Sequence, residues 1–509
     1  MPSRPITRLL IANRGEIAVR IARACRELGI LPVAVASEAD RGALHTRVAA
    51  ETVPIGPSPA DESYLRGDRL IAAARDRRCE AIHPGYGFLA QSAEFAEAVD
   101  RAGLIFVGPG PASLRLMGDK MAARRAMAAA GVPVIPGWEG TGEEEATVLR
   151  READRLGYPV LVKAAGGGGG RGMRVVATPD DLMAAVESAR RESLKAFGDG
   201  RLFLERVIEE ARHVEIQVLA DAHGECIHLF ERECSIQRRF QKIVEESPSP
   251  LLDEGQRTEM ARSAVTAARA CGYVNAGTIE FLVDRDHRYF FLEMNTRIQV
   301  EHPVTEMITG VDLVQAQIRI ASGDPLPVRQ DGVTRRGHAI ECRVNAEDPA
   351  REFSPCSGRV LLASFPSGPG LRVDAGLESG DPVTPYYDSL VAKIIVHAPD
   401  RPAALERMRE ALGRTAILGV ETNIPYLRAI LAHPVFGSGE ATTTFTGREL
   451  ASWRPAPISR ADDVLVVAAV VDLLRARSGS TWFRASREDD EEDRHSPWDR
   501  GDGFRTGAP

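Results

Sequence analysis

The sequence lacks the long apolar run and the leader that would mark a membrane or exported protein. Its longest wholly apolar run near the C-terminus, residues 464–471, is far shorter than the roughly 18 residues that a membrane-spanning helix needs. Residues 1–7 contain two prolines and no charged-then-apolar signal pattern. We therefore expect a cytoplasmic protein that does not bind membranes.

Paired cysteines and an excess of positive charge are also missing. The seven cysteines are scattered without a Cys-x-x-Cys pair, which argues against a zinc ribbon or a disulfide framework. The formal net charge of −8 makes broad nucleic-acid binding unfavourable, because neutralising phosphates requires a basic face. What is present, 44% hydrophobic and 27% charged residues over 509 positions, is typical of a globular chain with about three domains.

Lysine is scarce. Of the 64 basic residues only five are lysines, which leaves 64 − 5 = 59 arginines. A retained lysine suggests a site that needs a compact, rotatable charge, such as a phosphate clamp, although chance retention on the surface is the alternative. The five positions are Lys120, Lys163, Lys195, Lys242 and Lys393.

The first hundred residues alternate short apolar strands with a helical pattern. Residues 9–12 and 31–36 are expected to be buried strands, and an apolar stripe at helical spacing runs from Ile17 to Leu28 and stops at Gly29. This βαβ pattern predicts a Rossmann-like α/β fold. The first turn lacks Gly-x-Gly-x-x-Gly, so a dinucleotide fingerprint is not supported.

The rest of the chain divides by composition. Strands interleave with Gly-rich and acidic segments over about 119–320, and a polar linker with prolines follows. Residues 337–447 read as a third, α+β unit with a helical pattern at 402–412. We expect an amphipathic helix over 458–477 and a largely disordered, acidic end over 478–509.

A run of five glycines at 166–170 follows a strand-like segment that ends in Lys163. Such a run costs ordering entropy that an ordinary turn avoids, and it suits a loop whose backbone N–H groups close over phosphates. It is not a Walker A loop, since no Gly-Lys-Ser/Thr follows. The alternative is a flexible linker.

The segment 293–301 carries the densest polar pattern. If it is extended, alternation places five polar side chains on one face: Glu293, Asn295, Arg297, Gln299 and Glu301. Residues 277–283 and 288–295 should pair as a hairpin that places Glu280 opposite Glu293. Two facing carboxylates are destabilising unless a cation lies between them, and oxygen ligands of this kind suit Mg²⁺. The alternative is a solvated polar face.

Several motifs together resemble biotin carboxylase, from about residue 5 to residue 450. They are Ile-Ala-Asn-Arg-Gly-Glu-Ile-Ala at 11–18, His-Pro-Gly-Tyr-Gly-Phe at 83–88, Met-Gly-Asp-Lys at 117–120, the loop 163–173, Arg-His-Val-Glu-Ile-Gln at 212–217, the segment 293–309, and Tyr-Tyr-Asp-Ser at 386–389. Lys120 and Lys163 lie in these motifs, and Lys242 and Lys393 also fall at positions that match the family. The family makes carboxyphosphate from ATP and bicarbonate and then carboxylates N1′ of biotin on a carrier protein.

The resemblance implies an α/β protein of three parts and a tail. They are a Rossmann-like pre-ATP-grasp domain (5–118), an ATP-grasp domain (119–320), a C-terminal α+β biotin carboxylase domain (336–447), and a helical and then acidic tail (448–509).

The resemblance also assigns roles by position. Catalysis falls to Glu301 as the base for bicarbonate, to Lys242 and Arg297 as bicarbonate ligands, and to Arg343 at the biotin enolate. Nucleotide and bicarbonate contacts fall to Lys120, Lys163, Gly169, Gly170, Glu205, Ile208, His213, Gln237, Gln299 and Val300. The metal, Mg²⁺ or Mn²⁺, would be held by Glu280, Glu293 and Asn295.

Two positions depart from the family pattern. Phe240 stands where the family usually has His, which removes a polar contact near the nucleotide. Gln91 stands where a Glu is usual, which removes a carboxylate beside the biotin side of the site. Neither departure deletes a catalytic charge.

The resemblance therefore implies an ATP-dependent biotin carboxylase, working as a homodimer in the first half-reaction of an acetyl- or propionyl-CoA carboxylase. No lysine follows Lys393, and none lies in an Ala-Met-Lys-Met-like biotinylation motif, so biotin is expected on a separate carrier protein, with a separate carboxyltransferase. The alternatives are a pyruvate carboxylase subunit, another ATP-grasp ligase, and a non-catalytic paralogue. The tail from Ile458 is a candidate docking element for the carrier.

Overall fold

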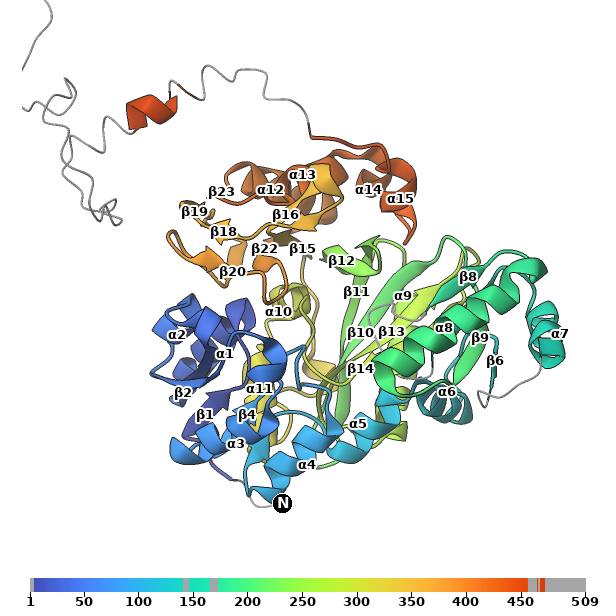
Figure 1. Ribbon diagram of the computed structural model, residues 1–509, viewed down its shortest axis with the longest axis horizontal. Helices are drawn as coiled ribbons and strands as arrows, with labels where there is room; N and C mark the ends of the chain where they lie inside the picture. The colour runs from blue at the N-terminus through green and yellow to red at the C-terminus, as the bar shows by residue number, and fades with distance from the viewer. Residues whose placement is uncertain (1–3, 141–145, 165–172, 456–464, 466, 472–509) are drawn as a thin grey trace, which may run out of the picture. The chain divides into compact units, whose positions relative to one another are not determined.

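A computed structural model of the chain describes residues 4–140, 146–164, 173–455, 465 and 467–471 (Figure 1). Residues 1–454 form one compact unit. The expected helix over 458–477 lies largely outside the described residues, although 465 and 467–471 are helical, and the acidic end lies wholly outside them. No helix among the described residues is long and apolar enough to cross a membrane.

The N-terminal part is a five-stranded parallel sheet in the order β3-β2-β1-β4-β5, which confirms the Rossmann-like prediction (Figure 1). Its strands are β1 (Arg8–Ile11), β2 (Leu31–Ser37), β3 (Glu51–Gly56), β4 (Ala81–His83) and β5 (Ile105–Phe106). Its helices are α1 (Gly15–Glu27), α2 (Leu44–Val48), α3 (Gly67–Asp76), α4 (Ala93–Arg101) and α5 (Pro111–Gly118). Helix α1 ends where Gly29 takes a positive φ of 72°, as its sequence position predicts.

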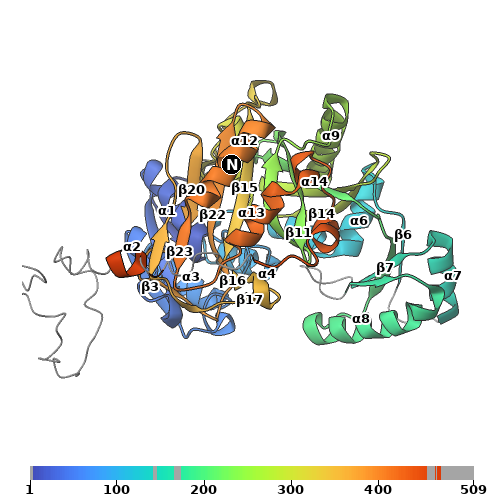
Figure 2. The ribbon, with the colours of Figure 1, turned by 90° about the horizontal axis from the view of Figure 1, so that it is seen from above.

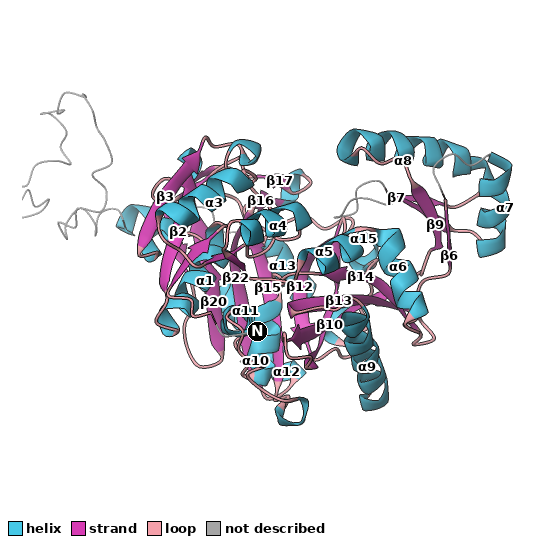
Figure 3. Ribbon diagram, turned by 90° about the horizontal axis from the view of Figure 1, so that it is seen from below, coloured by secondary structure: helices cyan, strands magenta, loops and turns pink. Residues whose placement is uncertain are grey.

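A four-stranded antiparallel sheet, β6-β9-β7-β8, follows and has its own hydrophobic cluster. Its strands are β6 (Gly137–Glu139), β7 (Val160–Ala164), β8 (Arg174–Val176) and β9 (Leu202–Arg206). The helices of this part are α6 (Lys120–Ala129), α7 (Ala146–Leu156) and α8 (Leu182–Phe197). Figure 3 shows α7 and α8 beside β7 and β9, where Leu149 and Val186 are buried.

A second, larger sheet has eight strands in the order β14-β13-β10-β11-β12-β15-β22-β20. Its strands are β10 (Arg212–Ala220), β11 (Cys226–Arg238), β12 (Gln241–Ser247), β13 (Asn275–Val283), β14 (Tyr289–Asn295), β15 (His338–Asn345), β20 (Leu371–Ala375) and β22 (Leu390–Ala398). The β12–β15 pairing, with Val244 opposite Cys342, joins the segments expected as the second and third parts. These two parts therefore share one sheet.

The remaining elements complete both faces of this sheet. The helices are α9 (Glu254–Ala270), α10 (His302–Thr309), α11 (Leu313–Ala321), α12 (Arg401–Gly413), α13 (Ile424–Ala432), α14 (Pro434–Gly437) and α15 (Phe445–Glu449). Short strands are β16 (Glu347–Asp348), β17 (Ser354–Pro355), β18 (Gly358–Arg359), β19 (Leu362–Ser364), β21 (Pro382–Val383) and β23 (Ala416–Leu418). The helical pattern at 402–412 is confirmed as α12.

Strand β15 separates an apolar face from a charged one. Ile340 and Cys342 pack in a core cluster with α12 and α13, which lie along β15 and β22 in Figure 2. Ala339 packs on the opposite face, in a cluster with residues of α10. Because side chains alternate along a strand, Glu341 and Arg343 lie on this α10 face.

The predicted hairpin is confirmed, including the end of its second strand at residue 295, but the extended conformation considered for 293–301 does not continue beyond that residue. Strands β13 and β14 pair antiparallel with Glu280 opposite Glu293. Strand β14 ends at Asn295, so alternation cannot place the side chains of Arg297, Gln299 and Glu301 on its face. Glu301 is instead the N-cap residue of α10. The chain turns here because Pro303 at the start of α10 suits the first turn of a helix and donates no hydrogen bond to a sheet.

Candidate active site

Lys242, on β12, is the centre of a buried charge cluster. Its Nζ lies 2.5 Å from Glu215 Oε2, 2.8 Å from Glu280 Oε1 and 2.7 Å from Glu301 Oε1. The sheet brings these groups together, because β10 pairs with β13 with Glu215 opposite Glu280. Burial acts to lower the pKa of Lys242, but the three carboxylates outweigh it and raise that pKa well above its usual value. The lysine therefore stays charged.

Glu301 is fully buried and has two cationic partners. Its Oε2 lies 2.8 Å from Arg343 Nη2 on β15, while its Oε1 faces Lys242. Burial acts to raise the pKa of Glu301, but Lys242, Arg343 and Arg232 lower it well below its usual value. Glu301 is therefore an ionised carboxylate that lies between two cationic side chains.

Glu215 and Arg232 belong to this cluster and are not among the site residues expected from the sequence. Arg232 has no exposed surface, and its Nε lies 2.5 Å from Glu215 Oε1. The same guanidinium donates to Gln217 and to Thr305 of α10, at 2.8 and 2.9 Å. The sequence does carry a signal for Arg232 as a site residue, because residues 231–233 are three charged residues in the middle of a strand-like segment.

A chain of hydrogen bonds continues from Glu280 into the segment after β14. Glu280 Oε1 accepts from Asn295 Nδ2 at 2.8 Å and from Gln299 Nε2 at 2.9 Å. Arg297 in turn donates to Asn295 Oδ1 at 3.0 Å and to Gln299 Oε1 at 2.7 Å. Lys393 of β22 donates to the carbonyl oxygen of Val300 at 2.8 Å. The polar residues of this segment therefore do converge, although through a turn and not along a strand.

The residues expected at the nucleotide lie on the four-stranded and the eight-stranded antiparallel sheets. Lys163 Nζ on β7 is 2.8 Å from Glu205 Oε2 on β9, and both side chains are almost fully buried. Ile208 is half-buried in the connection from β9 to β10. His213 of β10 lies with its Nδ1 2.7 Å from Gln237 Nε2. Gly169 and Gly170 lie outside the described residues.

His213 connects the residues expected at the nucleotide with the charge cluster around Lys242, since its Nε2 lies 3.0 Å from Glu280 Oε2. Lys120, at the start of α6, has its Nζ 3.8 Å from Glu293 Oε2. Burial lowers the pKa of Lys120 despite the nearby carboxylates. Cationic groups expected at the phosphates therefore lie beside the carboxylates expected to hold the metal.

The donor set suits a hard divalent cation. Glu280 and Glu293 face each other across the hairpin, and Asn295 adds a side-chain amide on the same strand as Glu293. Carboxylate and amide oxygens are the protein ligands that Mg²⁺ prefers. Burial acts to raise the pKa of Glu280, but Lys242 and His213 lower it far below its usual value, so this carboxylate is ionised. A second cluster, His213, Glu215 and Glu280, has ligand atoms within 4.8 Å of one another and shares Glu280.

The structure shows where the two residues that depart from the family pattern, Gln91 and Phe240, lie. Gln91 Oε1 accepts from Arg297 Nε at 2.9 Å, so the amide keeps a contact to the arginine. Phe240 lies in the turn between β11 and β12, is 65% exposed and has a positive φ of 66°. Its ring therefore projects into solvent, and the protein has not repacked around it.

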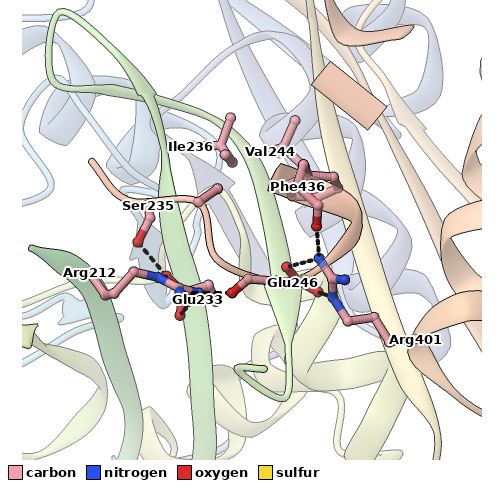
Figure 4. A pocket seen from close by; sticks show the side chains of 10 residues that line it. Arg212, Glu233, Ser235, Ile236, Val244, Glu246, Arg401 and Phe436 are labelled. Atoms are coloured by element: carbon pink, nitrogen blue, oxygen red, sulfur yellow. Dashed lines mark hydrogen bonds and ion pairs between the residues drawn. The ribbon is translucent and has the colours of Figure 1, made fainter. Parts of the chain in front are cut away.

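A separate small pocket lies between β10, β11, β12 and the segment before α15 (Figure 4). None of the predicted site residues lines it. Two buried ion pairs do: Arg212 Nη2 with Glu233 Oε2 at 3.1 Å, and Arg401 Nε with Glu246 Oε2 at 2.7 Å. The first pair joins β10 to β11 and the second ties α12 to the sheet, and Arg401 also donates to the Phe436 carbonyl at 2.7 Å.

Comparison with known families matches three models in succession. They are the biotin carboxylase N-terminal domain over residues 5–114, the ATP-binding domain of the carbamoyl-phosphate synthase L chain over 119–329, and the biotin carboxylase C-terminal domain over 341–448.

Similar proteins cover nearly the same residues. Biotin carboxylase of Nostoc sp. is 52% identical over 438 residues, which is 86% of this chain and 98% of the relative. The alpha subunit of mitochondrial methylcrotonoyl-CoA carboxylase of Dictyostelium discoideum is 46% identical over 505 residues, which is 99% of this chain and 71% of the relative. The biotin carboxylase domain dimer of Hydrogenobacter thermophilus 2-oxoglutarate carboxylase, solved with MgADP, ADP and bicarbonate, superposes with a TM-score of 0.86 at 47% identity, covering 89% of this chain and 99% of that one.

Proposed function

Because this chain belongs to the biotin carboxylase family, we propose that it uses ATP and bicarbonate to carboxylate biotin on a carrier protein, as the first half-reaction of an acyl-CoA carboxylase. The chain is an ATP-dependent carboxylase.

The observation that carries the proposal is the buried Glu301 between Lys242 and Arg343. Bicarbonate is a weak nucleophile, so attack on the γ-phosphorus of ATP needs a base for its proton and cations for its charge. Glu301 is the base, and Lys242 and Arg297 hold the anion together with Gln299 and the backbone of Val300. When bicarbonate takes over the contacts of the two cations, Glu301 loses part of its stabilisation and becomes more basic.

The nucleotide residues complete the site. Lys120 and Lys163 neutralise the phosphates, His213 and Gln237 line the site beside them, and the connection from Glu205 to Ile208 faces the adenine. Glu280, Glu293 and Asn295 would hold Mg²⁺, which would neutralise charge on the transferred phosphoryl group. In the second step Arg343 stabilises the negative charge that develops on the ureido oxygen as biotin is carboxylated at N1′.

The biotin comes from a carrier outside these 509 residues. Lys163 and Lys393 are buried, and Lys120 and Lys242 lie in the site. Lys195, in α8, follows a leucine where the biotinylation motif has Met. None has the Ala-Met-Lys-Met-like setting of a biotinylated lysine. We therefore expect a biotin carboxyl carrier protein and a carboxyltransferase as partners, and a homodimer of this chain.

The acceptor is proposed to be an acyl-CoA, with acetyl- and propionyl-CoA as the first candidates. In support, the similarity to an acyl-CoA carboxylase subunit spans 505 residues and so reaches beyond the compact unit. A pyruvate carboxylase subunit is the alternative. Labelled bicarbonate, supplied with the chains that co-purify, should move its label to acyl-CoA, whereas label in oxaloacetate would favour the alternative.

Bicarbonate-dependent ATP hydrolysis by the purified chain tests the reaction itself. We expect hydrolysis to require bicarbonate, Mg²⁺ and biotin or its carrier, with slow carboxylation of free biotin. Turnover that is stimulated by another carboxylate and not by bicarbonate would instead indicate a different ATP-grasp ligase.

A further inference from the structure

A second pair of buried glutamates lies behind Arg343, on the face of the sheet that α10 covers. In the antiparallel pairing of β12 with β15, Glu245 stands directly opposite Glu341. Neither residue has any exposed surface. Two carboxylates that face each other in this way repel if both are ionised, and the low-polarity surroundings strengthen the repulsion.

The hydrogen bonds of the pair are unequal. Glu245 Oε1 accepts from Arg343 Nε at 2.5 Å, the same arginine whose Nη2 reaches Glu301. The other oxygen of Glu245 and both oxygens of Glu341 have no hydrogen-bond partner within the described part of the chain. A buried carboxylate without partners is too costly to remain charged, whereas a protonated one can donate to its neighbour.

We propose that Glu245 and Glu341 share one proton and act as a positioning pair for Arg343. This inference rests on the proposed role of Arg343 at the reacting groups. Glu245 is the anionic member, anchored on the guanidinium, and Glu341 is the neutral member behind it.

With one shared proton, the two glutamates carry a net charge of −1. This charge stays beside Arg343 throughout the reaction. When Glu301 takes the proton of bicarbonate it loses its charge, and without Glu245 Arg343 would become a partly buried cation with no partner. Glu245 keeps the guanidinium in place through this step, so that its Nη groups stay directed at the reacting groups. Ionisation of Glu341 would add a second anion behind Arg343 and draw it away from them.

Charged and titratable groups on several elements interact with the pair. They are Cys234 on β11, Lys242 on β12, Cys342 and Arg343 on β15, Lys393 on β22, and Glu301 at the N-cap of α10. The same elements and β10 also carry Glu215, Arg232, His302 and Glu306. Burial, only partly offset by Lys393, raises the pKa of Glu341 well above its usual value, and Glu245 adds to the rise. Burial also raises the pKa of Glu245, to about 7, against the opposing effect of Arg343.

Infrared spectroscopy of the protein tests the shared proton without any turnover, so the result is independent of the proposed function. The wild-type chain should show the carbonyl band of a buried, protonated carboxyl group at about pH 7.5. This pH is about three units above the usual pKa of Glu, so ordinary glutamates are ionised and do not give the band. The isosteric E341Q should lose that band. A wild-type spectrum without the band, or a band that survives in both E341Q and E245Q, would overturn the proposal.

The pH dependence of catalysis tests the positioning role. Because a rise in pH removes the shared proton, kcat/KM for bicarbonate in the wild type should fall on the alkaline side, and in E341Q this fall should move up by about one pH unit or more. E245Q, which removes the counter-ion, should lower kcat by on the order of ten- to a hundredfold, with KM for ATP little changed.

The matched control is E246Q, the next residue of β12, whose side chain pairs with His338 and Arg401 away from Arg343. It should lower the unfolding temperature and keep the wild-type pH profile. If E341Q keeps the wild-type profile too, or if E246Q shifts it equally, Glu341 does not position Arg343.

Discussion

At the scale of single residues, the role proposed for Glu301 is that of a proton acceptor and not of a nucleotide ligand. We expect E301Q to lower bicarbonate-dependent ATP turnover by at least about a hundredfold, because a general base of this kind contributes on the order of 10²–10⁴ in rate. ATP binding, followed by fluorescence titration or calorimetry, should stay close to that of the wild type. Turnover at the wild-type rate would remove Glu301 from the mechanism.

Phe240 gives a second prediction at this scale. Its ring is 65% exposed and its backbone has a positive φ, a conformation that His adopts more readily than Phe. F240H should therefore fold at least as stably and lower KM for ATP by about two- to tenfold, since a hydrogen bond has a net worth of about 0.5–1.5 kcal/mol. F240A separates the two effects, because it removes the ring without adding a polar group. Equal KM values for F240H and F240A would mean that no polar contact is made there.

At the scale of elements, the β13–β14 hairpin places its two facing glutamates in different surroundings. Glu280 accepts from Lys242, Asn295 and Gln299, whereas Glu293 lies beside Lys120 at 3.8 Å. Both E280Q and E293Q should raise the Mg²⁺ concentration needed for half-maximal activity, by about tenfold for the loss of one anionic ligand.

The two variants should differ in kcat. E280Q also breaks the network that orients Lys242, so kcat should fall further than in E293Q, even at saturating Mg²⁺. Metal titrations of both variants, with Mn²⁺ as a second probe, measure this difference. An unchanged metal dependence in both would place the metal elsewhere, for example at the His213, Glu215 and Glu280 cluster.

At the scale of the whole molecule, buried ion pairs hold the larger sheet to the helices that cover it. Burial acts to raise the pKa of Glu246, but His338 and Arg401 lower it to about 2, below the unfolded value of about 4.3. A carboxylate whose folded pKa is depressed contributes stability above the unfolded pKa and loses it as the pH falls towards the folded pKa. The free energy of unfolding should therefore fall steeply between about pH 4.5 and pH 2.

E246Q tests this prediction by denaturant unfolding at several pH values. The variant should be less stable than the wild type at pH 7 by about 3 kcal/mol or more, because Arg401 loses its buried partner. Its stability should also depend less on pH between about 4.5 and 2. Parallel pH curves for the variant and the wild type would show that Glu246 is not among the groups that cause acid unfolding.

Local rules were sufficient for much of the fold. The βαβ unit at the N-terminus and the helix at 402–412 follow from apolar periodicity, and the pairing of Glu280 with Glu293 follows from counting out from a short turn. The sequence also marked Lys163, Lys242 and Glu301, because scarce lysines and a dense polar motif stand out from their surroundings. Each of these features depends on neighbours within a few residues or on composition.

The tertiary structure alone decided which distant groups meet. Arg343 and Glu245 are 98 residues apart in sequence and lie 2.5 Å apart, and nothing local to either predicts their contact. The end of β14 at Asn295 and the turn into α10 likewise place Glu301 between Lys242 and Arg343, where strand alternation would not. Cross-strand pairing between remote segments depends on the packing of the whole sheet, and so the buried charge balance at the site does too.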